Sequence, residues 1–303
     1  MQLRTFQALL TIIRFPNLVF IALTQIMVYG FIVRPAVERT GAVLHLTTLP
    51  FLILMFSTLI IAAAGYMIND YFDIGIDAIN KPHKVTIEKI FKRRSIIIAH
   101  VLLNTFAMGM AIWAALQCGS IRFIWIQFLS IFLLTIYSST FKRKLIIGNL
   151  MIATLTALTV LSVGIYEPGF QTYMPGKYHV KLLWVYTFFA FIITWIREIV
   201  KDIEDVKGDS SLNCRTVPLV WGINSAKTFI HVLLFILMIL ILAVVLNFRT
   251  HSLLVIHFTA LVFFPLIGVV FQLKTAKTAV QFHRTSSIIK WITLTGIISM
   301  IFI

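Results

Sequence analysis

Long apolar stretches alternate with short polar interruptions along the whole chain. Each stretch is close to the length of about 20 residues that an α-helix needs to cross a bilayer, and a helix satisfies its own backbone hydrogen bonds in hydrocarbon. The pattern therefore predicts an all-α, polytopic membrane protein with about nine transmembrane helices. We expect these helices at residues 16–35, 47–68, 95–117, 121–140, 145–165, 181–200, 226–247, 252–272 and 285–303.

The composition excludes an ordinary soluble domain, because 59% of the residues are hydrophobic and only 12% are charged. The only substantial polar interruptions are residues 69–94, 141–144, 166–181 and 201–225. No low-complexity tract divides the chain. We therefore expect a single transmembrane domain that covers residues 1–303.

The net charge of +15 could indicate either nucleic-acid binding or membrane topology. In the nine-helix arrangement, 20 of the 26 Lys and Arg residues lie on the side of the N-terminus and the even-numbered loops. This asymmetry follows the positive-inside rule, whereas no nucleic-acid-binding motif is present. We expect a multi-pass protein of the cell (inner or plasma) membrane, with the N-terminus and the even-numbered loops cytoplasmic and the C-terminus on the opposite side.

Acidic residues are few, and eight of the eleven fall in two short clusters on the expected cytoplasmic side. Membrane insertion does not require this clustering, because acidic residues contribute little to topology. In each cluster three aspartates follow the spacing i, i+3, i+7, which places residues on one face of a helix. The two sets are Asp70, Asp73 and Asp77, and Asp202, Asp205 and Asp209.

Carboxylates on one helix face repel one another, so a cation has to compensate for their charge. Mg²⁺ prefers hard oxygen ligands and completes its coordination with water and phosphate oxygens. We therefore interpret the two sets as sites that hold Mg²⁺ between the protein and a diphosphate. The alternative is that each cluster is a solvated helix end, neutralised by Lys81, Lys84, Lys201 and Lys207.

Basic and polar residues elsewhere are candidates for contacting a phosphate. Lys142 and Arg143 lie between the fourth and fifth predicted helices, and Arg can bind a phosphate with two hydrogen bonds. The alternative is that this pair serves only as a positive-inside signal. Arg14 and Asn17 flank the start of the first helix, where Asn17 would either bind a partner inside the membrane or cap the helix.

Several of these residues match a known family. Asn69-Asp70-x-x-Asp73-x-x-x-Asp77 resembles the first signature of the UbiA superfamily of intramembrane prenyltransferases, and Asp202-x-x-Asp205-x-x-x-Asp209 resembles the second. Further positions that look like family positions are Arg14, Asn17, Tyr137, Lys142, Arg143 and Asn149. Within the superfamily, the string from Arg197 to Asp209 is most similar to that of the digeranylgeranylglyceryl phosphate synthases.

The resemblance implies helices around a central cavity and Mg²⁺-dependent transfer of a geranylgeranyl group from an allylic diphosphate. The expected acceptor is geranylgeranylglyceryl phosphate, in ether-lipid synthesis. The implied metal ligands are the six aspartates, and the implied catalytic residues are Asp70, Asp73, Asp202, Asp205, Lys142 and Arg143. The implied substrate-binding residues are Arg14, Asn17, Asn69, Tyr137, Lys142, Arg143, Asn149, Arg197 and Lys201.

Two other functions stay open at this point. Prenyltransferases of quinone pathways share the fold and the metal chemistry but prenylate hydroxybenzoate, homogentisate or dihydroxynaphthoate. A cation transporter would also carry carboxylates inside a membrane domain, but it needs polar groups near the bilayer midplane. Here the carboxylates are expected at one face of the membrane, which favours the enzyme.

Overall fold

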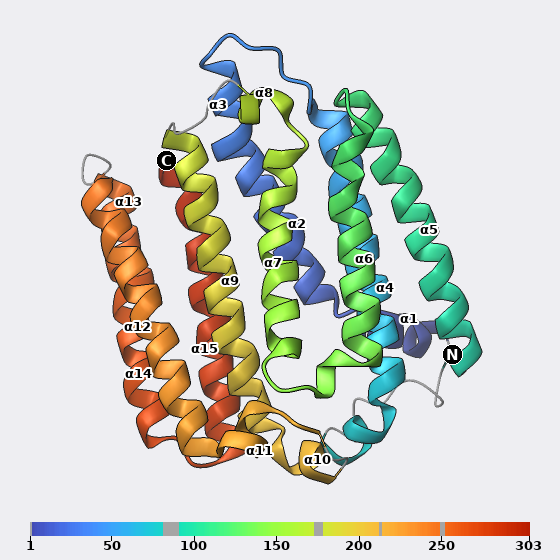
Figure 1. The fold of residues 1–303 in the computed structure, drawn as a ribbon, viewed down its shortest axis with the longest axis vertical. Coiled ribbons are helices and arrows are strands. Elements are labelled where there is room, and N and C mark those ends of the chain that lie inside the picture. The colour runs from blue at the N-terminus through green and yellow to red at the C-terminus, as the bar shows by residue number, and fades with distance from the viewer. Residues whose placement is uncertain (1, 81–90, 173–177, 212–213, 249–251) are drawn as a thin grey trace.

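The structure is a computed structural model that describes residues 2–80, 91–172, 178–211, 214–248 and 252–303. Within these residues, nine helical spans are long and apolar enough to cross a membrane, which confirms the prediction. They pack side by side as one all-α bundle (Figure 1). The spans consist of α2 (Phe15–Met27) with η1 (Val28–Val33) and α3 (Arg34–Glu38), α4 (Thr48–Asn80), α5 (Arg93–Gln117), η2 (Ile121–Ile124) with α6 (Trp125–Ser139), α7 (Ile147–Ile165), α9 (Tyr178–Glu204), α12 (Ile223–Asn247), α13 (Ser252–His257) with η4 (Phe258–Phe263) and α14 (Phe264–Thr275), and α15 (Ala279–Ile298) with η5 (Ser299–Phe302).

Short elements connect the spans, and several helices are longer than predicted. The connecting elements are α1 (Gln2–Ile12), η3 (Phe141–Arg143), α8 (Pro168–Thr172), α10 (Val206–Ser211) and α11 (Val217–Trp221). The largest difference from the prediction is in α4, which continues past residue 68 to Asn80. Hydropathy ends a helix where the apolar run ends, but the polar residues from Asn69 onward keep a helical backbone. The aspartates of the first set therefore lie on one continuous helix.

The two aspartate-bearing regions lie at the same end of the bundle, which we call the site end (the lower end in Figure 1). The η3 turn, α10 and α11 lie there too, and α10 packs against α4. The C-terminus lies at the opposite end, near α3 and α8. The structure thus agrees with the predicted arrangement, in which even-numbered loops share one end and the C-terminus lies at the other.

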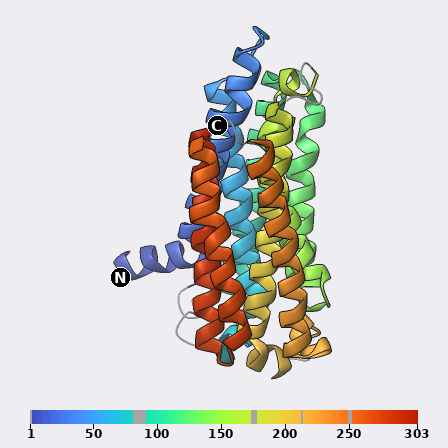
Figure 2. The ribbon, with the colours of Figure 1, turned by 90° about the vertical axis from the view of Figure 1, so that its left-hand side faces the viewer.

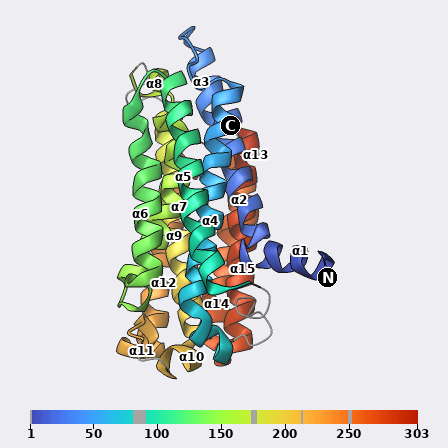
Figure 3. The same ribbon diagram turned by 90° about the vertical axis from the view of Figure 1, so that its right-hand side faces the viewer.

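The first helix, α1, was not among the predicted helices. It leaves the bundle nearly at right angles, at the level where α2 begins (Figures 2 and 3). Between the two helices, Arg14 has a φ of 50°, in the left-handed region, which turns the chain sharply. Phe6 and Leu9 of α1 are exposed. An exposed apolar helix at right angles to a membrane bundle is typical of a segment that lies along the membrane surface.

Two spans contain a π-helical segment immediately before a proline. η1 precedes the Arg34-Pro35 pair, and η4 precedes the Phe264-Pro265 pair. Proline has no N–H and its ring crowds the carbonyl of the preceding turn, so a wider local turn accommodates it. In the second case the freed carbonyl of Leu261 accepts a hydrogen bond of 3.0 Å from the hydroxyl of Thr295 on α15. The bundle therefore satisfies a backbone group that would otherwise face hydrocarbon unpaired.

Helix α9 is central to the packing, because it contacts α7, α12 and α15. Its side chains Ile193, Ile196 and Ile199 are fully buried. The close approach of α15 to α9 depends on a glycine, since a Cβ atom at Gly296 would lie 2.7 Å from Cε1 of the buried Phe189. Interfaces between membrane helices commonly use such small residues to bring helices together.

We expect the Gly296→Ala variant to lower the free energy of unfolding by about 1–3 kcal/mol, because the added methyl group forces the Phe189 ring or α15 to move. The measurement is the thermal unfolding midpoint of the purified protein in detergent. Gly109→Ala is the matched control, since a Cβ atom there meets nothing within 4 Å. An unchanged midpoint in Gly296→Ala would show that the α9–α15 contact is not close.

Candidate active site

The first aspartate set is held by residues from three parts of the chain. On α4, the amide nitrogen of Asn69 donates a 2.7 Å hydrogen bond to Oδ2 of Asp73, and both side chains are buried. Lys142, on η3, pairs with the same carboxylate and lies 3.3 Å from Oδ1 of Asn69. Arg14 donates from Nη2 to Oδ1 of Asp70 at 2.8 Å. The side chain of Asp77 lies outside the described residues.

Arg14 also stacks on an aromatic ring, with its guanidinium carbon 5.0 Å from the centroid of Tyr66. Loss of water would by itself lower the pKa of Arg14, but its interactions with Asp70, Tyr66 and Asp73 together outweigh this effect and raise that pKa. Arg14 therefore stays charged at every physiological pH. Tyr66 precedes Asp70 by four residues and so shares its helix face, a spacing that could have identified it from the sequence.

A strained turn positions Lys142. After η3 the chain reverses at Ile146, which has a φ of 62°, an unfavourable value for a β-branched residue. Gly148 then packs against the turn, because a Cβ atom there would lie 2.9 Å from the carbonyl oxygen of Phe141 and 3.2 Å from Cα of Lys142. Strain of this kind persists where the surrounding structure holds it, often at functional sites.

Arg143 lies beside Lys142, but its side chain is exposed. Its backbone carbonyl accepts a 2.9 Å hydrogen bond from the N–H of Arg215, which ties the turn to the segment after α10. The structure therefore brings Lys142 to the buried carboxylates and leaves the predicted partner Arg143 at the surface.

The second aspartate set does not lie on one continuous helix, which corrects the prediction drawn from its spacing. Helix α9 ends at Glu204, Asp205 lies in a turn, and α10 carries Asp209. Only Asp202 lies on α9, where its Oδ2 accepts a 2.8 Å hydrogen bond from the amide of Asn149 in the first turn of α7. The break turns α10 toward α4, so Asp209 is buried near the first set.

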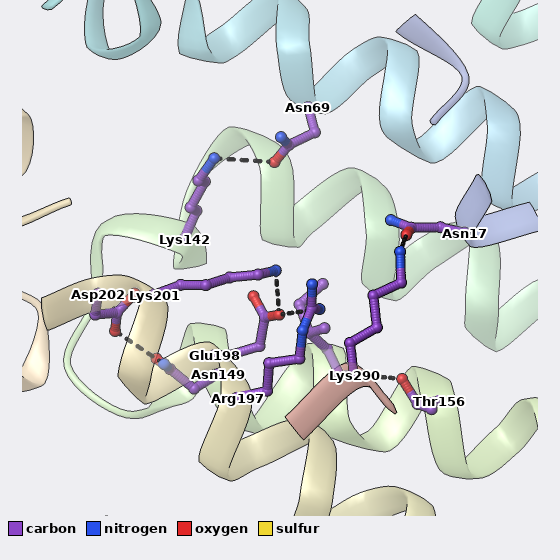
Figure 4. A network of polar contacts seen from close by, with 11 residues as sticks. Asn17, Asn69, Lys142, Asn149, Thr156, Arg197, Glu198, Lys201, Asp202 and Lys290 are labelled. Atoms are coloured by element: carbon purple, nitrogen blue, oxygen red, sulfur yellow. Dashed lines mark hydrogen bonds and ion pairs between the residues drawn. The ribbon is translucent and has the colours of Figure 1, made fainter. Parts of the chain in front are cut away.

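A further acidic residue, Glu198, lies one helical turn before Asp202 on α9, and together with its partners Lys201 and Arg197 we call it the Glu198 cluster (Figure 4). Oε1 of Glu198 accepts a 2.5 Å hydrogen bond from Lys201 and lies 3.6 Å from Nη1 of Arg197. Tyr137 is close enough to Glu198, Asp73 and Asp202 to experience their charges. Glu198 precedes Asp202 by four residues on α9, and this spacing could have identified it as a site residue.

The described residues contain no group of three metal-binding side chains already gathered around one point. Instead, three of the aspartates each have a partner from another part of the chain. Asp70 pairs with Arg14, Asp73 with Lys142, and Asp202 with Asn149. The arrangement is a group of paired polar and charged side chains at one end of an apolar bundle (Figure 1).

Comparison with known proteins assigns the family. Residues 39–291 match the model of the UbiA prenyltransferase family, which is well over half of the chain. The chain belongs to this family. The digeranylgeranylglyceryl phosphate synthases of Saccharolobus solfataricus and Thermococcus sibiricus are each 33% identical to it, over 193 and 189 residues. The matched region covers 60% and 62% of this chain and of the respective relative, so the chain spans about three fifths of the length of these relatives.

Solved structures share the fold over nearly the whole chain. One, from work on digeranylgeranylglyceryl phosphate synthase in membranes, has a TM-score of 0.66 at 22% identity and covers 98% of this chain and 99% of its own. Another, a UbiA homolog from Archaeoglobus fulgidus bound to DMAPP and Mg²⁺, has a TM-score of 0.61 at 16% identity and covers 95% and 98%. At these identities the likeness establishes the fold.

We expect Gly148→Ala to displace the η3 turn and to lower the free energy of unfolding by about 1–3 kcal/mol, because the methyl group meets backbone atoms that cannot rotate away. The measurement is thermal unfolding in detergent. The control is Gly65→Ala, where the methyl group meets the movable end of Leu134.

The same variant tests the link to Lys142. In an Asp73→Asn background the contact of Lys142 with a charged carboxylate is already lost, so Gly148→Ala should cost less there than in the wild type. Equal costs in both backgrounds would show that Gly148 does not position Lys142.

Proposed function

We propose that this protein transfers a geranylgeranyl group from geranylgeranyl diphosphate to the free hydroxyl of geranylgeranylglyceryl phosphate, a step in the synthesis of ether phospholipids. The observation that carries the proposal is the gathering of two aspartate-bearing helix ends around Lys142 at one end of an apolar bundle. Membership of the prenyltransferase family supports the reaction type. The names of the relatives support the acceptor.

The donor atoms at the site end fit a divalent cation such as Mg²⁺. They are carboxylate and amide oxygens, the hard ligands that Mg²⁺ prefers, and Mg²⁺ commonly uses only one or two protein carboxylates together with substrate phosphates. The residues that would hold it are Asp70, Asp73, Asp77, Asp202, Asp205 and Asp209. When bound, Mg²⁺ would supply Lewis-acid neutralisation of the diphosphate.

The basic residues of the site would stabilise the charge that develops on the leaving diphosphate. Lys142 and Lys201 each bear several N–H donors; Lys142 pairs with Asp73, and Lys201 reaches Glu198 (Figure 4). Donors that are already in place when the C–O bond breaks lower the barrier without further reorganisation. We assign the same role to Arg143, which would have to turn inward from its exposed position.

The bundle would protect the allylic carbocation from water. The spans that surround the site carry apolar side chains, which also suit a long isoprenoid chain. Tyr137 lies among the site carboxylates, and its ring face could stabilise a nearby positive charge. The surplus of Lys and Arg at the site end supports a cytoplasmic position for this end, in the cell membrane.

The first test is transfer of labelled geranylgeranyl diphosphate by the purified protein, with and without Mg²⁺. The acceptors, supplied in parallel, are geranylgeranylglyceryl phosphate, hydroxybenzoate, homogentisate and dihydroxynaphthoate. We expect Mg²⁺-dependent product with the glyceryl phosphate alone. Product with only an aromatic acceptor would support prenyl transfer but reject geranylgeranylglyceryl phosphate as the acceptor. No product with any acceptor would reject the proposal and favour transport.

We expect Asp73→Asn and Asp205→Asn each to reduce kcat/KM by about 100-fold or more, because each removes a charged ligand from the developing transition state. The measurement is the same transfer assay under saturating Mg²⁺. Glu38→Gln is the matched control, since Glu38 pairs with Arg34 at the opposite end of the bundle and is exposed. Full activity in either aspartate variant, at wild-type stability, would contradict the assignment of that aspartate as a Mg²⁺ ligand.

A further inference from the structure

Lys290 is a half-buried cation that forms no ion pair with a carboxylate among the described residues. Lys290 lies on α15, in the ninth span. Its Nζ lies 3.3 Å from the amide oxygen of Asn17 and 4.8 Å from the ring centroid of Phe20. Both partners are neutral, and no carboxylate among the described residues forms an ion pair with it.

The nearest cation reinforces this surplus of positive charge. Arg197 is close enough to Lys290 for the two charges to repel each other. Its Nε is buried without a hydrogen-bond partner among the described residues, and its Nη1 lies 3.6 Å from Glu198. Glu198 is already bound to Lys201 at 2.5 Å. Arg197 and Lys290 are both half-buried, and Glu198, the carboxylate beside Arg197, is shared with Lys201. Partial burial of cations that are incompletely neutralised favours the binding of an anion.

Lys290 lies apart from Lys142 and Asp202 (Figure 4). Lys290 and Asn17 lie on one side of the Glu198 cluster, whereas Lys142 and Asp202 lie on the other (Figure 4). Asn17 belongs to the first turn of α2, at the level where α1 leaves the bundle along the expected membrane surface. A lipid headgroup at that surface would meet Lys290 at the same depth, with its chains in the bilayer.

We infer that Lys290, together with Asn17 and Arg197, binds the phosphate monoester of the acceptor lipid. The three side chains offer an ammonium, an amide and a guanidinium with a free N–H, a donor set suited to the oxygens of a phosphate. The donor diphosphate, by contrast, belongs to the aspartate end. The inference rests on the proposed function. It places the acceptor phosphate and the donor diphosphate on opposite sides of the Glu198 cluster.

The test compares Lys290→Gln with the wild type in the transfer assay. We expect the KM for geranylgeranylglyceryl phosphate to rise roughly 10- to 100-fold, the usual effect of one lost charge-assisted hydrogen bond. The KM for geranylgeranyl diphosphate should stay within about twofold, and so should the KM for geranylgeranylglycerol, which lacks the phosphate. Lys290→Arg, which keeps the charge, should recover most of the acceptor affinity.

Lys227→Gln is the matched control. Lys227 is another half-buried lysine of a membrane helix near the site end, and it donates to the backbone carbonyl of Ala276. It should change none of these constants. A rise in the KM for the diphosphate, or no change in the KM for the phosphorylated acceptor, would overturn the inference.

A binding experiment keeps the inference testable if the wild type transfers to no acceptor. The unfolding midpoint is measured with geranylgeranylglyceryl phosphate, without donor or Mg²⁺, for the wild type and Lys290→Gln. Stabilisation of the wild type alone supports the phosphate site even where the proposed reaction has failed. Stabilisation of neither, or equal stabilisation by phosphatidic acid, would overturn the assignment to the acceptor.

Discussion

The carboxylates at the end of this apolar bundle have to be paired, and this constraint shapes the site. An unpaired carboxylate near hydrocarbon is too costly to keep charged, so each needs a partner, and two of them find it in another segment. Arg14 reaches Asp70 from the junction of α1 and α2, and Lys142 reaches Asp73 from the η3 turn. These contacts tie α2 and the turn between α6 and α7 to α4.

The ion pairs Arg14–Asp70 and Lys142–Asp73 each join a single cation to a single carboxylate. Such pairs suit the proposed site for two negatively charged substrates, because each cation could bind a phosphate in place of its carboxylate. In the proposed reaction, Lys142 and Arg14 would move from the aspartates to substrate phosphates and the freed carboxylates would hold Mg²⁺, so the net charge of the site would change little. The backbone supports this arrangement with unusual conformations. Arg14 and Ile146, the two non-glycine residues with positive φ in the described chain, lie directly beside the site.

The polar side chains drawn at the site end in Figure 4 form two groups, one on each side of Glu198. Asp202 and Lys142 lie on one side of Glu198, and Lys290 with Asn17 lies on the other (Figure 4). Helix α1 meets the bundle on the level of the second group, where a lipid headgroup is expected (Figures 2 and 3). An apolar bundle can thus keep two anionic groups apart while their hydrocarbon chains share the same membrane.

The sequence by itself determined the nine spans and the common end of the two aspartate sets, because hydropathy and helical spacing are properties of neighbouring residues. Only the tertiary structure decided which charges meet. Lys290 contacts Asn17 across 273 positions, and the break at Asp205 that brings Asp209 toward α4 interrupts a spacing typical of a helix. Such pairings depend on the packing of whole helices, and no local pattern contains that information.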